Sequence, residues 1–465
     1  MKRTVFVLFI GLASATLWGQ DITGQWNGVL KVQGIQLRLV FHVTETATGY
    51  SATMDSPDQG ATGIPVTAAS FENRTLKMTV AGAGIEYEGI LGEDGVIAGA
   101  FRQMGQSFPL NLSKKAVETA KTVRPQEPAK PYPYREEEVS FENAEAGITL
   151  AGTLTLPQKE GSFPAVVLIS GSGAQNRDEE LMGHKPFLVI ADCLTRNGIA
   201  VLRFDDRGTA ASTGDFKTAT SLDFSKDAEA AVKYLQTRKE INRKKIGLIG
   251  HSEGGIIAPM LASRSKDVAF IVLLAGTGVR GDRLLLSQQE AIYTASGMSM
   301  EAWKELKAFN EKAFEMVVRS TNTEQLKSDL TDYLKQALKE YPDQKPQGMS
   351  EEQFIQTSLS QMTSPWMIHF IKYDPVPALE KTKCPVLALN GEKDLQVPAK
   401  ENLEAIFAAL TKGGNRRVTI KEFSGLNHLF QECTTGLPAE YATIEQTFSP
   451  AALEEMLQWI NVQTR

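Results

Sequence analysis

The most constraining stretch of this sequence is a G-x-S-x-G motif that stands between an apolar run and a helix-like segment. The run 246–249 is typical of a buried strand, and residues 256–262 after the motif favour a helix. Between strand and helix the chain must reverse sharply, which Gly250 and Gly254 allow because they have no side chain. The pattern predicts that Ser252 stands clear of a sheet as a nucleophile; the alternative is a serine in a structural glycine-rich turn.

The size and charge of the chain narrow the classes of function. It has 465 residues and a formal net charge of −6, which predicts two or three domains and argues against nucleic acid and anionic membrane surfaces as partners. A basic start followed by the apolar stretch 4–17 is typical of a bacterial-type secretory signal peptide. That stretch is too short to span a bilayer. We therefore expect a signal peptide over residues 1–20, export to the periplasm or the extracellular space, and no stable membrane insertion.

Changes of pattern divide the remaining chain into two domains. Residues 21–115 alternate apolar and polar side chains, as in 35–43 and 76–80, with turn signals at short intervals. This pattern predicts a small all-β accessory domain, either a sandwich or a barrel. Four prolines predict a stiff linker over 116–134. From 135 to 465 buried strands alternate with helices, which predicts a mostly parallel, doubly wound α/β sheet with helices on both faces.

The alternation of strands and helices stops over about 281–375, where apolar residues recur at helical spacing. Two sets are each expected to share one helix face: Trp303, Leu306, Phe309, Ala313 and Val317, and then Leu326, Leu330, Tyr333, Ala337 and Tyr341. An insertion of this length between two neighbouring strands predicts a helical lid over the rim that carries Ser252. Trp366, in an apolar stretch of the insertion, is a candidate substrate-binding residue that would face an acyl group.

A serine hydroxyl needs a base to remove its proton and a carboxylate to orient that base. Among five histidines, His428 follows the last predicted strand, and its loop should open on the same rim as Ser252. We predict His428 as the base and Asp394, which follows another buried strand, as the acid; Glu392 is the alternative acid. The order serine, aspartate, histidine along the chain is the order of the α/β-hydrolase triad.

The oxyanion that develops during acyl transfer needs backbone N–H donors. One is expected from Glu253, the residue after the nucleophile, and the other from Ser172 or Gly173 in the loop after an early strand. The Glu253 side chain stands at a helix N-terminus, where a negative charge is stabilising, so we interpret it as structural. This chemistry requires neither a metal nor an organic cofactor, and we expect none.

Three motifs extend the pattern beyond the triad. They are the G-S-G-x-x-x-R-D-E loop at 171–179, the Asp-Asp-Arg-Gly segment at 205–208 and the Gly-x-x-Asp loop at 391–394. With these motifs, residues 135–465 resemble the α/β-hydrolase superfamily. The resemblance is greatest to exported bacterial esterases and serine-peptidase-like (dienelactone-hydrolase-like) members with an N-terminal β accessory domain.

Two features of the oxyanion loop need a structural explanation. Many of the proteins that the chain resembles have His-Gly where this chain has Ser170 and Gly171, which leaves open what supports the loop. Arg177 is either a second candidate substrate-binding residue or forms an ion pair with Asp178 that braces the loop.

The sequence thus predicts an exported serine hydrolase that cleaves small-molecule carboxylic esters through an acyl-enzyme. A serine peptidase or amide hydrolase using the same triad is the first alternative. A catalytically silent protein, whose β domain binds a glycan or another cell-envelope component, is the second.

Overall fold

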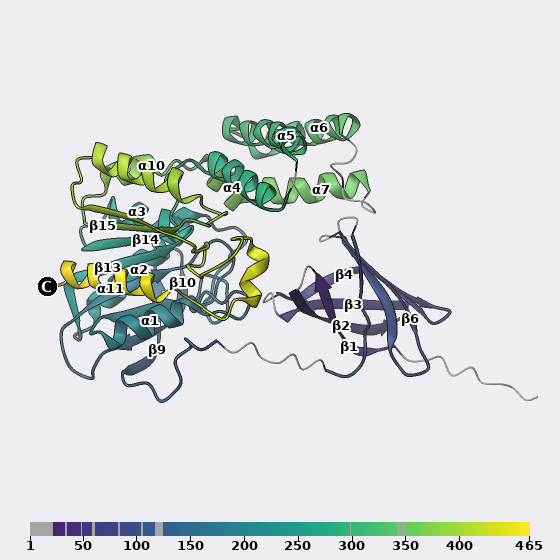
Figure 1. Cartoon of the computed structure of the whole chain (residues 1–465), viewed down its shortest axis with the longest axis horizontal. Helices are drawn as coiled ribbons and strands as arrows, with labels where there is room; N and C mark the ends of the chain where they lie inside the picture. The colour runs from purple at the N-terminus through teal and green to yellow at the C-terminus, as the bar shows by residue number, and fades with distance from the viewer. Residues whose placement is uncertain are drawn as a thin grey trace, which may run out of the picture. The chain divides into compact units, whose positions relative to one another are not determined.

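The computed structural model describes residues 22–32, 35–47, 49–57, 61–81, 84–103, 106–116, 124–297, 299–341, 345 and 350–465. The expected signal peptide over 1–20 lies outside the described residues. The chain divides into two compact units, one built around Arg38–Ser56 and Thr62–Val117 and the other around Glu118–Arg465 (Figure 1).

The first unit is a meander of eight strands in which each strand pairs with the next along the chain. The strands are β1 (Gly24–Val32), β2 (Ile35–Thr46), β3 (Gly49–Ser56), β4 (Ala61–Glu72), β5 (Thr75–Val80), β6 (Ile85–Leu91), β7 (Ile97–Gln103) and β8 (Gln106–Pro109). The chain after β8 returns to β1, where Asn27 and Ser113 exchange two backbone hydrogen bonds of 2.7 and 2.9 Å. This pairing joins the two ends of the sheet, so the barrel alternative describes the unit. Its interior is filled by large side chains, including Trp26, Phe41 and Tyr87.

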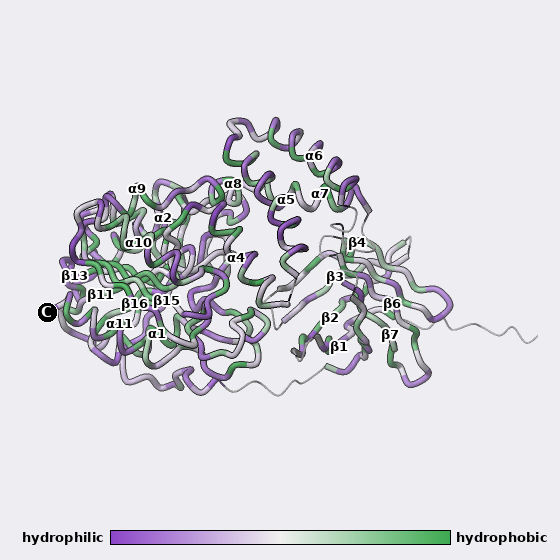
Figure 2. The backbone as a smooth tube through the Cα atoms, turned by 45° about the horizontal axis from the view of Figure 1, so that its top comes forward, coloured by the Kyte–Doolittle hydropathy of each residue, from purple (hydrophilic) through white to green (hydrophobic). Residues whose placement is uncertain are grey.

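The second unit contains a mixed sheet in the order β16-β15-β14-β13-β11-β12-β10-β9. Its strands are β9 (Arg135–Asn143), β10 (Ile148–Leu156), β11 (Phe163–Ile169), β12 (Ala200–Phe204), β13 (Ile241–His251), β14 (Phe270–Leu274), β15 (Val386–Gly391) and β16 (Val418–Phe423). β10 pairs antiparallel with β9 and with β12, and the other pairs are parallel. The central strands are apolar along their whole length because helices cover both faces, and Figure 2 shows this hydrophobic band.

Two hydrophobic clusters hold the helices against the sheet. One face packs against α2 (Ser221–Thr237), α3 (Gly254–Ala262) and α10 (Ala399–Lys412). The other face packs against α1 (Pro186–Arg196) and α11 (Pro450–Gln463). The predicted α/β class is therefore confirmed, and the carboxyl ends of the parallel strands meet at one rim.

Helices fill the long interval between β14 and β15, as the sequence predicts (Figure 1). They are α4 (Gly281–Ala295), α5 (Met300–Arg319), α6 (Thr323–Glu340), α7 (Glu351–Met362), α8 (Pro365–Lys372) and α9 (Val376–Lys381). The expected face of α5 is buried at Trp303, Ala313 and Val317. On α6 the prediction is wrong at one position, because Tyr341 lies at the helix C-cap and is exposed, and the buried face continues through Leu338 instead.

The stretch predicted as a linker makes specific contacts within the second unit. The Arg124 guanidinium donates to the carbonyl oxygens of Met182 and Ala442 at 2.9 and 3.2 Å. The Gln126 side chain donates to the Phe448 carbonyl at 2.6 Å. The end of this stretch is therefore docked on the α/β unit rather than free.

Candidate active site

Ser252 occupies a strained turn between β13 and α3. Its φ of 52° lies in the left-handed region, which a serine adopts only when the surrounding structure imposes it. The flanking glycines are sterically required: a Cβ at Gly250 would lie 2.0 Å from the Gly254 carbonyl oxygen, and one at Gly254 would lie 2.2 Å from that of Ile169. The Ser252 N–H donates to the Leu274 carbonyl of the neighbouring strand at 2.9 Å, which fixes the turn on the sheet.

His428 and Asp394 form a buried hydrogen-bonded pair in the loops after β16 and β15. Nδ1 of His428 lies 2.8 Å from Oδ2 of Asp394. Oδ1 of Asp394 accepts the backbone N–H groups of Gln396 and Val397, both at 2.8 Å, which prevents the carboxylate from rotating. A carboxylate can only accept, so Nδ1 of His428 carries the proton and Nε2 remains able to accept one.

The alternative acid, Glu392, has different partners. Its carboxylate is exposed and accepts the Ser424 hydroxyl at 2.5 Å and the Gly425 N–H at 2.9 Å. These bonds hold the pKa of Glu392 below its usual value. The geometry therefore favours Asp394 as the partner of His428.

The structure pairs His428 with Asp394 and brings His251, the neighbour of Ser252, against His428, but no hydrogen bond joins Ser252 to His428 among the described residues. The ring of His251, the residue before Ser252, lies 4.8 Å from the ring of His428. Within the described chain, the Ser252 hydroxyl makes no side-chain hydrogen bond. Loose contacts of this kind are common in catalytic sites without a substrate and tighten when one binds.

The oxyanion loop after β11 is held against Ser252 by two carboxyl groups. Oε1 of Glu179 accepts the Gly171 N–H at 2.6 Å. Asp206 accepts the Ser170 hydroxyl at 2.8 Å and the Gln175 N–H at 2.9 Å, and burial raises its pKa to about 8. These contacts supply the support that the sequence left open where Ser170 replaces histidine.

The Glu253 side chain connects the turn at Ser252 to the helical insertion. Its Oε1 accepts the Ser221 hydroxyl of α2 at 2.5 Å and the Trp366 indole N–H of α8 at 2.9 Å. Burial raises the pKa of Glu253, and hydrogen bonds from these two residues and from Ser172 of the oxyanion loop oppose this effect. Trp366 is also stacked on Phe370, with ring centroids 4.9 Å apart. The structure thus places Trp366 beside the residue that follows the nucleophile.

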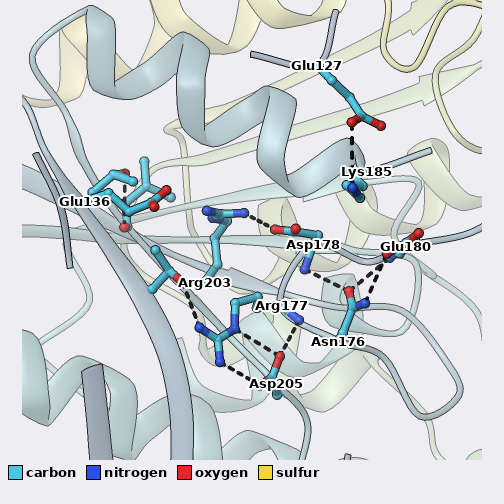
Figure 3. Close-up of polar contacts among 12 residues, drawn as sticks. Glu127, Glu136, Asn176, Arg177, Asp178, Glu180, Lys185, Arg203 and Asp205 are labelled. Carbon is cyan, nitrogen blue, oxygen red and sulfur yellow. Dashed lines mark hydrogen bonds and ion pairs between the residues drawn. The ribbon is translucent and has the colours of Figure 1, made fainter. Parts of the chain in front are cut away.

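Arg177 acts as a brace, and its main partner differs from the expected one (Figure 3). Its guanidinium pairs with both oxygens of Asp205, with Nε–Oδ1 at 3.1 Å and Nη2–Oδ2 at 2.8 Å. The same group also bonds to Thr153 at 2.8 Å and to Glu138. Asp178, the partner expected from the sequence, instead pairs with Arg203. With four of its five donor sites occupied, Arg177 has little capacity left for a substrate.

Sequence reasoning missed Glu179, His251 and Asp206 as parts of the site. Glu179 and Asp206 lie inside the motifs at 171–179 and 205–208, but no local pattern shows that they face the strand end that carries Ser252. Across the part of the chain that the structure describes, no group of three or more His, Cys, Asp or Glu residues is arranged to hold a metal ion. Over those residues no helix is long and apolar enough to cross a membrane.

Comparison with known proteins identifies a family and several relatives of this chain. The family model of X-Pro dipeptidyl-peptidases (S15 family) matches residues 146–425, more than half of the chain. Esterase EstD of Thermotoga maritima is 36% identical over 135 residues, which cover 29% of this chain and 32% of EstD. Human acyl-coenzyme A thioesterase 1 is 29% identical over 128 residues, 27% of each chain. The chain thus spans about a third of the length of the curated relatives it matches.

Solved structures with a similar arrangement include an esterase from Pyrococcus furiosus. It aligns with a TM-score of 0.44 at 15% sequence identity and covers 75% of this chain and 100% of its own.

Proposed function

We propose that this chain, which belongs to the X-Pro dipeptidyl-peptidase (S15) family, cleaves carboxylic esters with Ser252, His428 and Asp394 as nucleophile, base and acid. The chain is a serine hydrolase of the α/β-hydrolase type. The observation that carries the finer assignment is the 2.8 Å hydrogen bond between buried His428 and Asp394, on the rim where Ser252 tops its strained turn.

In the proposed reaction, Ser252 Oγ attacks the acyl carbon while His428 Nε2 takes its proton. The imidazolium formed is stabilised by the Asp394 carboxylate, which already bonds Nδ1. His428 then returns the proton to the leaving alkoxide, so that an alcohol departs and an acyl-enzyme remains. A water molecule, deprotonated by His428, attacks the acyl carbon and releases the acid and the Ser252 hydroxyl.

Two backbone N–H groups are the proposed oxyanion donors. The Glu253 N–H and the Ser172 N–H have no acceptor within the described residues, so both can donate to a developing oxyanion. Gly173 remains the other candidate from the loop; its φ of 102° requires a glycine there. The Glu253 side chain has its own partners, and we assign it no proton-transfer role.

Peptide hydrolysis is the second candidate, since the matched family is named for a dipeptidyl-peptidase activity. Binding the amino terminus of a peptide requires a carboxylate that faces the substrate. Of the carboxylates beside Ser252, Glu253 is bonded to Ser221 and Trp366, and Glu179 is bonded to Gly171. Both carboxylates are buried and accept their hydrogen bonds through Oε1, while Oε2 of Glu179 has no partner among the described residues. Their burial inside the protein supports an ester as the substrate.

The test compares two substrate classes on the same protein. A fluorophosphonate probe should label the wild type at Ser252 and should not label Ser252→Ala. The wild type should hydrolyse p-nitrophenyl esters at least about tenfold faster, in kcat/KM, than aminoacyl-prolyl naphthylamides. Absence of labelling would support the silent binding protein, and a faster amide reaction would support the peptidase.

We also propose that the protein is exported. The support is the basic and apolar start of the chain, which is typical of a signal peptide. Fractionation of cells that produce the full chain would test this; cytoplasmic protein with an intact N-terminus would refute it.

A further inference from the structure

Behind the nucleophile turn lies a buried pair that the reaction does not use. His251 Nδ1 is 2.9 Å from Oε1 of Glu179, and the two side chains are 8% and 6% exposed. The lining around them is apolar and includes Phe187, Leu274 and Phe448. Replacing a buried ion pair by apolar residues of similar volume often leaves the stability of a protein unchanged or raises it. The presence of Glu179 and His251 in these apolar surroundings therefore needs a reason other than stability.

The hydrogen bonds of His251 determine its charge. Nδ1 faces the Glu179 carboxylate, and Nε2 lies 3.0 Å from the backbone carbonyl oxygen of His428. Oε1 of Glu179 also accepts the Gly171 N–H at 2.6 Å. Since both partners of the ring are acceptors, both ring nitrogens must carry hydrogen for both bonds to form. The ring is then an imidazolium, paired with the Glu179 carboxylate.

We propose that Glu179 and His251 are positioning residues, forming a buried ion pair that sets the oxyanion loop and the base loop in register around Ser252. The chain of contacts runs from the Gly171 N–H through the carboxylate and the imidazolium to the His428 carbonyl. It thereby joins the loop that supplies an oxyanion donor to the loop that supplies the base. The expected effect of this pair on kcat rests on the proposed function, whereas the charge of the pair does not depend on it.

The local geometry explains why this link must be tight. A Cβ at Gly171 would lie 3.2 Å from the Ser252 Cβ and 3.3 Å from Oε1 of Glu179, so the loop runs close to both. Burial is the largest single influence and lowers the pKa of His251, but the Glu179 carboxylate, the His428 carbonyl and Asp394 together leave that pKa raised. Asp394 is the other charged group that acts on the ring, and it also favours the imidazolium.

The charge can be measured without any assay of activity. Nitrogen NMR of protein labelled in its five histidines, with His251 assigned from a His251→Gln variant, reports the protonation of each ring nitrogen. We expect both nitrogens of His251 still to be protonated at pH 7.5, above the pH at which an ordinary histidine loses its proton. One unprotonated nitrogen at pH 7.5 would overturn the ion pair.

The positioning role is tested with Glu179→Gln, against Glu180→Gln as the matched control. Glu180 is the next residue of the same loop, but it is exposed, and among the residues that the structure describes its side chain bonds only to Asn176. In the wild type, Oε1 of Glu179 accepts from the Gly171 N–H and from Nδ1 of His251, and Nε2 of His251 donates to the His428 carbonyl. A neutral imidazole has a single N–H, so beside a glutamine His251 can donate to residue 179 or to the His428 carbonyl, but not to both. We expect Glu179→Gln to lower kcat by about 10- to 100-fold with KM changed less than about threefold, and His251 to become neutral in the NMR spectrum.

The two proposals fail in different ways. A kcat of Glu179→Gln within about twofold of that of Glu180→Gln would overturn the positioning role, whatever the charge of His251. If Glu179→Gln does not fold, the NMR spectrum of the wild type still tests the ion pair. A wild-type His251 with one unprotonated nitrogen at pH 7.5 would refute it. A wild type that is not labelled at Ser252 would overturn the proposed function instead.

Discussion

Replacing Asp394 by asparagine should disable the base while leaving the structure intact. Oδ1 of Asp394 accepts two backbone N–H groups, from Gln396 and Val397. An asparagine must keep its oxygen at that position, because an NH₂ group there would leave two buried donors unpaired at about 1–3 kcal/mol each. The NH₂ group therefore falls at the position of Oδ2 and faces Nδ1 of His428, which now has to accept a hydrogen bond.

This reversal fixes the size of the expected effect. With Nδ1 accepting, the ring proton moves to Nε2, the atom that must take the proton of Ser252. The same tautomer error in the serine-protease template lowers kcat by about 10⁴, or about 5 kcal/mol of transition-state stabilisation. Since the two backbone bonds are kept, we expect the melting temperature of Asp394→Asn to change by only a few degrees.

The assay is kcat for p-nitrophenyl acetate together with thermal unfolding, with Glu392→Gln as the control. Glu392 lies two residues away in the same loop, and its exposed carboxylate bonds to Ser424 and Gly425. Its replacement removes the same charge without touching His428, so kcat should remain within about threefold of the wild type. A larger loss in Glu392→Gln than in Asp394→Asn would refute the assignment of the acid.

Three further predictions follow from contacts around the rim. Trp366→Phe keeps an aromatic ring but loses the hydrogen bond to Glu253, so it should alter the preferred acyl length of p-nitrophenyl esters less than Trp366→Ala; equal effects would show that the lost hydrogen bond, and not the ring, accounts for the change. Burial raises the pKa of Asp206 to about 8 from a usual value near 4, so its protonated form stabilises the fold at low pH and this contribution is lost as pH rises from about 4 to 8. Asp206→Asn should reduce the fall in melting temperature over that range; an unchanged slope would contradict the shift. A chain starting at Arg124 should still be labelled at Ser252, whereas one starting at Tyr134 loses the docked contacts and should melt lower; equal melting temperatures would refute this contribution.

The features that the sequence predicts well are those that depend on neighbouring residues. The strained turn at Ser252 is encoded within five residues, because only glycine fits at 250 and 254. The central parallel strands are recognisable because burial on both faces requires a continuous apolar run. Asp394 and His428 can be assigned to loops in the same way, because each follows a recognisable strand. These two strands run in the same direction, so both loops lie at one rim of the sheet.

The features that the sequence does not predict depend on pairings between distant residues. Asn27 and Ser113 close the barrel although 86 positions separate them, and neither lies in a recognisable motif. Arg177 has acidic residues both next to it and far along the chain, and only the fold selects Asp205 as its partner. Tyr341 fits the helical period, but α6 ends before it, and a period cannot show where a helix stops.

Glu253 connects the predicted lid to the proposed chemistry in this fold. Its backbone N–H is a proposed oxyanion donor, while its carboxylate binds Trp366 of the lid and Ser221 of α2. A displacement of α8 by a bulky substrate would break or stretch the hydrogen bond between Trp366 and Glu253. Glu253 would then lose a partner, and it is the residue directly after Ser252. Because the Glu253 carboxyl is buried, losing the indole donor costs free energy. The position of α8 in which Trp366 bonds to Glu253 is therefore favoured over positions in which it does not. Under the proposed function, we therefore expect the helical insertion to select substrates through the rate of the chemical step as well as through the space it leaves for them.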